Sequence, residues 1–201
     1  MICAITFSKS QFIHYLLSIN KMRLKLSTLI LVLIFFSIQC FAQTDIETLV
    51  NEGIQYHDNG DYIKAIEIYK KALELNPKST LVNYEISFSY LKKGDFSEAI
   101  KYADVVLEQD DDYKLQAYIT KGSALDMIGK TNESIILFKE AILKTEGHFL
   151  LYYNLDLDYF KINELDLAEG NIIKAIEMNP NHSSSHLMLA NINNQKGNSD
   201  C

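Results

Sequence analysis

The chain has 201 residues, of which 48% are hydrophobic and 22% are charged, values that are typical of a folded globular protein. It contains only eight glycines and two prolines, which favours helices and argues against a turn-rich β fold. The formal net charge of −7 gives a surface that repels nucleic acid and anionic lipid headgroups. Binding to nucleic acid is therefore disfavoured.

The first 42 residues have a composition of their own. They contain four Lys and Arg residues, no Asp or Glu, and an apolar run from Leu26 to Ile38. Together with the small residues before Gln43, this pattern predicts a secretory signal peptide over residues 1–42 that is cleaved after Ala42. Met22 is an equally good start, so residues 1–21 are interpreted as an over-extended start or a lengthened basic region.

Cleavage would make the protein exported, in the periplasm or associated with the envelope. Lys+Arg would fall from 19 to 15 while Asp+Glu stays at 26, so the net charge would become −11. The alternative is an uncleaved leader that anchors the chain in a membrane, although the apolar run is shorter than the ~20 residues of a spanning helix. Only Cys201 would survive cleavage, so the fold must depend on helix packing without an internal disulfide.

From residue 45 onward the sequence predicts pairs of short amphipathic helices joined by tight turns. Asn59-Gly60-Asp61 is a turn signal, and it recurs at Gly94, Gly129 and Asn163 with spacings of 34, 35 and 34 residues. The predicted helices span about 45–58, 62–75, 79–93, 96–109, 114–128, 132–144, 149–162, 165–178 and 184–196. Their predicted N-caps include Asp61, Ser79, Asp95, Thr131 and Ser183.

The same small and aromatic residue types recur at the same place in each pair. Residues expected to pack between neighbouring helices are Gly53, Tyr56, Ala65, Tyr69, Ala72, Tyr90, Ala99, Gly122, Phe138, Ala141, Tyr159, Ala168 and Ala175. This pattern resembles the tetratricopeptide repeat (TPR) family. The resemblance implies an all-α, right-handed α-solenoid of about four helix-turn-helix repeats plus one C-terminal helix. The implied TPR domain covers 43–201, with repeats at about 46–79, 80–114, 115–148 and 149–182 and a half-repeat at 183–201.

In this family the first helix of each pair lines a concave groove, and the stripe that faces it here is apolar and aromatic. Its residues are Ile54, His57, Tyr84, Phe88, Leu91, Ile119, Tyr153, Leu157 and Phe160. Such a stripe predicts contact with a protein or peptide partner, in particular an apolar or extended segment with few negative charges. The alternative is that these residues are buried by tight curvature of the array, by the C-terminal helix or by an oligomer contact.

Known chemical motifs are missing from the sequence. Some TPR proteins grip a terminal carboxylate with basic and amide side chains, but the corresponding positions here hold Val50, Ile54, Glu85 and Thr120. Asp156 and Asp158 are two residues apart on a predicted helix and should point to different sides, which disfavours a paired-carboxylate site.

His182 and His186 straddle a predicted helix start, so neither a metal site nor a cofactor is predicted. The sequence therefore predicts a non-catalytic, exported interaction scaffold. The alternatives are a truncated regulatory or assembly domain of a longer protein and, less well supported, a hydrolase.

Overall fold

The computed structural model describes residues 46–109 and 112–199, together with the isolated positions His14, Leu17, Lys21, Met22 and Lys25. By its internal contacts, Thr48–Cys201 is one compact unit, separate from Met1–Glu47. The predicted signal peptide and its cleavage after Ala42 lie almost wholly outside the described residues. Within the described part of the chain, no helix combines the length and the apolar character needed to cross a membrane.

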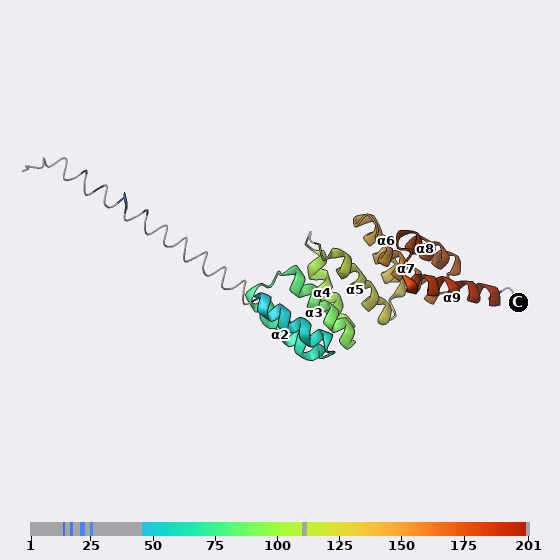
Figure 1. The fold of residues 1–201 in the computed structure, drawn as a ribbon, viewed down its shortest axis with the longest axis horizontal. Helices are drawn as coiled ribbons and strands as arrows, with labels where there is room; N and C mark the ends of the chain where they lie inside the picture. The colour runs from blue at the N-terminus through green and yellow to red at the C-terminus, as the bar shows by residue number, and fades with distance from the viewer. Residues whose placement is uncertain are drawn as a thin grey trace, which may run out of the picture. The chain divides into compact units, whose positions relative to one another are not determined.

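The regular structure of the described residues is entirely α-helical, as predicted (Figure 1). After the helical residues 46–58, the helices are α2 (Tyr62–Leu75), α3 (Thr80–Lys93), α4 (Phe96–Leu107), α5 (Lys114–Met127), α6 (Thr131–Lys144), α7 (Phe149–Lys161), α8 (Leu165–Met178) and α9 (Ser183–Ser199). The predicted ranges agree with these to within three residues at every end. Helix 46–58, α3, α5 and α7 are the first helices of four repeats, and α2, α4, α6 and α8 are the second helices.

The turns within the four repeats share one backbone geometry. Gly60, Gly94 and Gly129 have positive φ angles of 81°, 88° and 82°, and Asn163 takes the same left-handed conformation with φ of 63°. In every turn the backbone N–H of the next residue donates to the carbonyl of the residue five positions before it, as from Asp61 to Tyr56 and from Glu164 to Tyr159, both at 2.9 Å. This is a Schellman arrangement, which requires a residue that tolerates positive φ. The predicted turn signals are therefore confirmed.

The two Asn-Pro sequences end their helices in the same way. Asn76 and Asn179 have nearly equal backbone angles, and each side-chain Oδ1 accepts a hydrogen bond at 3.3 Å from the backbone N–H two residues later. The asparagine side chain thus accepts a backbone hydrogen bond at the point where the helix ends. The first and fourth repeats consequently present equivalent starting points to α3 and α9.

The predicted packing residues lie where the repeat pattern places them. Of the thirteen, only Tyr56 is half-buried; the other twelve are buried. Gly53 and Gly122 lie against aromatic rings of the second helices, since a Cβ atom on them would come within 2.3 Å of the Tyr69 ring and 2.2 Å of the Phe138 ring. In the second and fourth repeats the glycine position on the first helix holds Ser87 and Asp156. The aromatic position on the second helix holds Ala103 and Ile172.

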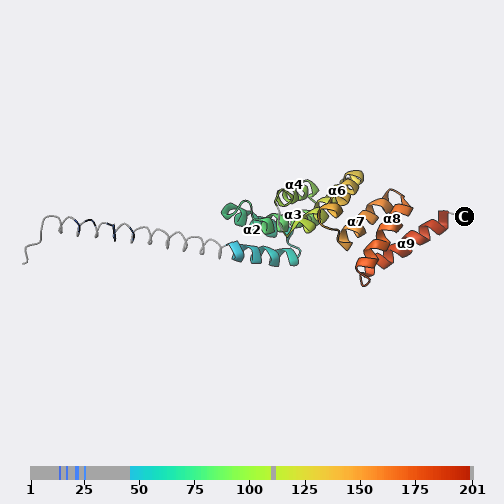
Figure 2. The ribbon, with the colours of Figure 1, turned by 90° about the horizontal axis from the view of Figure 1, so that it is seen from above.

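Consecutive helices pack against each other along the whole array, and the first helices also touch one another, α3 with α5 and α5 with α7. Figure 2 shows this succession from α2 to α9. A large apolar cluster extends from α5 to α9 and includes Leu151, Ile172 and Ile192. Because each repeat buries its apolar face on its neighbours, stability depends on the array rather than on any single pair.

Asp61, Ser79 and Asp95 occupy N-cap positions as predicted, whereas Thr131 and Ser183 do not. The Asp61 carboxylate accepts from the Lys64 N–H at 3.1 Å and the Ser79 hydroxyl from the Val82 N–H at 3.4 Å, as expected of caps. Asp95, however, makes no side-chain cap hydrogen bond. Thr131 and Ser183 are the first helical residues rather than caps. The prediction of an N-cap at Thr131 was wrong. The Thr131 hydroxyl donates to Asp126 Oδ1, at 2.7 Å, instead of accepting a hydrogen bond from its own helix.

Candidate functional site

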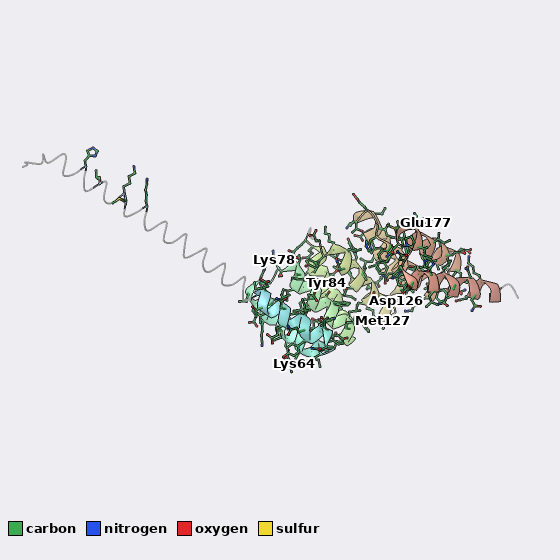
Figure 3. The ribbon with its side chains drawn as sticks, in the orientation of Figure 1. Lys64, Lys78, Tyr84, Asp126, Met127 and Glu177 are labelled. Atoms are coloured by element: carbon green, nitrogen blue, oxygen red, sulfur yellow. The ribbon has the colours of Figure 1, made fainter. Side chains whose placement is uncertain are left out.

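The nine residues predicted to face the groove, referred to here as the inner stripe, lie on the first helices of the four repeats. Ile54 and His57 come from helix 46–58, Tyr84, Phe88 and Leu91 from α3, Ile119 from α5, and Tyr153, Leu157 and Phe160 from α7. All nine are half-buried. Figure 3 labels one of these residues, Tyr84 on α3. The side chains of the inner stripe are thus partly accessible and partly packed against neighbouring residues.

Aromatic rings form a continuous row across the first two repeats and the start of the third. The His57 ring stacks on Phe88 with centroids 4.9 Å apart, Phe88 lies 6.1 Å from Tyr84, and Tyr84 lies 5.6 Å from Tyr113. The three pairs are nearly parallel, with interplanar angles of 14° to 20°. We call His57, Phe88, Tyr84 and Tyr113 the aromatic row. It joins three helices that are far apart in sequence into one apolar strip.

The surroundings of His57 favour its neutral form. Its Nδ1 lies 2.7 Å from the hydroxyl of Ser89, which is buried in α3. Burial lowers the pKa of His57 and nearby Lys92 lowers it further, whereas Asp58 acts in the opposite direction. The Lys92 ammonium lies 5.1 Å from the centroid of the Phe88 ring. The row therefore has a positively charged edge and an uncharged histidine at its end.

A second aromatic cluster lies at the C-terminal end of the inner stripe. His182, in the turn before α9, contacts Phe149 and Tyr153 edge-on, with centroid distances of 5.0 Å in both cases. The His182 Nδ1 is held 2.7 Å from the Ser185 hydroxyl. Tyr153 is thus partly covered by the beginning of α9, in line with the self-burial alternative for this one residue.

An ion pair crosses the stripe between the third and fourth repeats. The Lys161 ammonium of α7 donates to Asp126 Oδ1 at 2.7 Å and to the Asp126 backbone carbonyl at 3.1 Å. Ile119, Leu157 and Phe160 pack against the large apolar cluster at the same level. The ion pair is half-exposed, so it orients the end of α5 against α7 more than it adds stability.

Two of the carboxylate-clamp positions face the core. Val50 and Thr120 are buried, so these positions are closed to a ligand as well as lacking basic side chains. Glu85 lies 3.5 Å from the Tyr69 hydroxyl, and burial raises the pKa of its carboxyl group. An acidic group at this point disfavours binding of a terminal carboxylate.

Four aromatic or histidine side chains in these clusters were missed by the sequence prediction: Tyr113, His148, Phe149 and His182. All four lie in or next to the connections between repeats, outside the helix stripe from which the prediction was built. The sequence did offer a signal for these four side chains: each is an aromatic residue or histidine within two positions of the start of a helix that opens a repeat.

The structure assigns no metal or catalytic chemistry to the described residues. Among them, no three His, Cys, Asp or Glu side chains are grouped so as to hold a metal ion. His186 Nε2 lies 2.7 Å from the Pro180 carbonyl, and His182 is engaged by Ser185. Asp156 and Asp158 are both buried within α7.

A family model described as Tetratricopeptide repeat matches residues 56–119, from the end of the first helix into α5. The solved structure of MamA protein matches with a TM-score of 0.63 and 25% sequence identity, covering 76% of this chain and 83% of that one. Residues 56–119 belong to the tetratricopeptide repeat family. This assignment agrees with the 34- to 35-residue period and the helix pairs, and it supports a role in protein interaction.

Two curated relatives match this chain over part of their own length. The NADPH oxidase activator of Dictyostelium discoideum is 30% identical over 129 residues, which is 64% of this chain and 20% of that protein. Photosystem I assembly protein Ycf3 of Prochlorococcus marinus is 46% identical over 52 residues, which is 26% of this chain and 30% of that protein. The chain thus spans a fifth to about a third of the length of these two relatives.

Proposed function

We propose that the protein is an exported, non-catalytic TPR scaffold that docks a protein or peptide partner along the inner stripe. The observation that carries the proposal is the aromatic row, in which rings from helix 46–58, from α3 and from the turn before α5 lie side by side and remain half-exposed. Aromatic side chains supply a large contact area at low entropic cost and are enriched among residues that dominate binding energy.

The charge around the row favours a particular kind of partner. The inner stripe contains no Asp, Glu, Lys or Arg, while Glu85 and the overall excess of Asp and Glu repel acidic segments. We expect the partner segment to be extended or apolar, with few negative charges. MamA, the Dictyostelium activator and the photosystem assembly protein support an interaction role of this general kind, without indicating which partner this chain binds.

The combined substitution of Phe88→Leu and Tyr153→Leu tests the inner stripe. It removes one ring from each aromatic cluster while keeping apolar volume in a half-buried position, so the fold should be retained. We expect recovery of the partner from the exported fraction to fall by roughly tenfold, because each ring is a candidate binding hot spot. The measurement is quantitative affinity capture with equal amounts of wild-type and variant protein.

Ile63→Ser is the matched control, since Ile63 is an exposed apolar residue on the second helix α2. It should leave partner recovery unchanged, and circular dichroism should be the same for all three proteins. Equal recovery by the wild type and the double variant would contradict docking on the inner stripe.

Export is tested separately by the N-terminus of the mature protein. Expression in a bacterium with an intact secretion system should give a periplasmic protein whose first residue is Gln43, as measured by intact mass and N-terminal sequencing. Ala42→Leu should block processing, because the small residue before the cleavage point would be lost. A mature protein that retains residues 1–42 would instead indicate the uncleaved anchor.

A further inference from the structure

The junctions between repeats are built around one column of residues in the first helices. Tyr56, Tyr90 and Tyr159 occupy it in the first, second and fourth repeats, and Leu125 occupies it in the third. At two junctions a lysine from the preceding second helix covers the ring. Lys70 lies 5.6 Å from the centroid of Tyr90, and Lys139 lies 5.5 Å from that of Tyr159.

The junction between α4 and α5 departs from this arrangement in two ways. Leu125 is smaller than the tyrosines, and the residue in the column of Lys70 and Lys139 is Asp104. In addition, Lys121 occupies a position at which the second and fourth repeats have the buried apolar residues Ile86 and Leu155. The Lys121 ammonium reaches across to Asp104 Oδ1 at 2.6 Å, and its side chain is 23% exposed.

The missing ring leaves an open cavity of about 350 Å³ between the second helices α4 and α6. Its base contains Leu125 and the ion pair of Lys121 with Asp104, and its walls include Ile100, Ile128 and Ile136. A further hollow of about 340 Å³ shares the same ion pair. The volume is at the lower end of the range of ligand pockets, and the mouth opens on the face formed by the second helices, away from the inner stripe.

The cavity is also lined by the charged residues Lys130, Glu133 and Glu140, and the exposed apolar side chain of Ile136 lies among them. Ile136 is 66% exposed, whereas the equivalent residues of the other repeats are Glu67, Lys101 and Gly170. Leu143, two turns further along α6, is 85% exposed, and its equivalents are Glu74, Glu108 and Glu177. At these two positions the other three repeats carry only Glu, Lys or Gly. An apolar surface here indicates contact with a partner.

We propose that this outer cavity binds the side chain of a tyrosine or phenylalanine from a partner polypeptide. The inserted ring would take the place that Tyr90 and Tyr159 fill from within at the neighbouring junctions. Leu125 and Ile100 contact its faces, the Lys121 ammonium supplies the cation that Lys70 and Lys139 supply elsewhere, and Ile136 packs on the residue next to the ring. The site is separate from the inner stripe and does not depend on it.

A titration with two blocked five-residue peptides, one with a central tyrosine and one with a central alanine, tests this site. NMR spectra of the isoleucine δ1-methyl groups report on Ile100, Ile128 and Ile136, which line the cavity. We expect the tyrosine peptide to shift these three signals with saturation, and the alanine peptide to bind at least about tenfold more weakly.

Two variants close the site in different ways. Leu125→Tyr restores the residue type of the other repeats and fills the cavity from within, and Ile136→Glu restores a charged rim at an exposed position where unfolding is not expected. Each should reduce the affinity for the tyrosine peptide by about tenfold or more. Leu125→Met keeps the cavity and should bind as the wild type does. The proposal is overturned if the wild type shows no saturable shift at these methyl groups, or if binding persists unchanged in Ile136→Glu.

Discussion

Replacing Gly122 with serine is expected to lower the free energy of unfolding by about 2 kcal/mol, because a Cβ atom at this position would lie 2.2 Å from the Phe138 ring. Phe138 is fully buried, so the ring cannot turn outward to relieve the clash. Phe138→Ala alone should cost about 3–5 kcal/mol through the cavity that it leaves.

The combination of both substitutions reproduces the second repeat, which has Ser87 and Ala103 at these positions. Its loss of stability should therefore be smaller than the sum of the single losses by about 1–3 kcal/mol. Urea denaturation followed by far-UV circular dichroism measures all three values.

Gly170 provides the matched control for the glycine substitution. It lies within α8, and a Cβ atom there would meet nothing within 4 Å. Gly170→Ser should therefore leave stability unchanged or raise it slightly, since serine is the better helix former. Strict additivity of Gly122→Ser and Phe138→Ala would show that the two positions do not share one packing volume, and the account of the alternating columns would then be wrong.

The repeat period made most of the fold predictable. The small residues Ala65, Ala99, Ser134 and Ala168 recur in one environment four times, so each repeat supports the interpretation of the others. The turn at Asn163 was found in the same way, although it lacks the glycine of its equivalents. The caps were less predictable, because a hydroxyl such as that of Thr131 selects among several acceptors, and Asp126 is brought within reach only by the folded turn.

The candidate sites were only partly predictable. The stripe on the first helices followed from helical spacing, but the aromatic row also needs Tyr113, whose position depends on how α5 enters the array. The outer cavity results from what is missing at Leu125 together with the reach of Lys121 toward Asp104. A sequence column shows a smaller residue, but whether neighbouring side chains close the gap is decided by three-dimensional packing.

Asp156→Asn should raise the free energy of unfolding at pH 8, and by a smaller amount at pH 5. Asp156 is fully buried in α7, and neither of its carboxylate oxygens has a hydrogen-bond partner. Burial raises the pKa of this carboxyl group from 3.8 to about 7. The folded state therefore binds the proton more tightly than the unfolded state does, and the asparagine amide imitates the protonated form without its charge penalty.

The sign of the pH dependence follows from this difference. The stability of the wild type should be greatest below about pH 4, decrease as the pH rises from 4 to 7, and level off above the folded-state pKa. Each pH unit in that window corresponds to 1.36 kcal/mol for one group, so the gain from Asp156→Asn at pH 8 should be about 2–4 kcal/mol. Asp158 adds to the wild-type slope: burial raises its pKa to about 7, Asp126 acts in the same direction, and Ser134 and Lys161 act against it.

Urea denaturation of the wild type and Asp156→Asn at pH 5 and pH 8 measures the effect, and Asp112→Asn, at an exposed position before α5, is the control. For the control, the free energy of unfolding should differ between pH 5 and pH 8 by the same amount as for the wild type.

Asp156 occupies the position at which Gly53 and Gly122 admit an aromatic ring, and its counterpart in the second helix is Ile172. A carboxylate is retained there at a cost that grows with pH, so equal stability of Asp156→Asn and wild type at pH 8 would mean that the group has found water or a partner. If the gain is observed, Asp156 is a group that weakens the packing of α7 as the pH rises from 4 to 7.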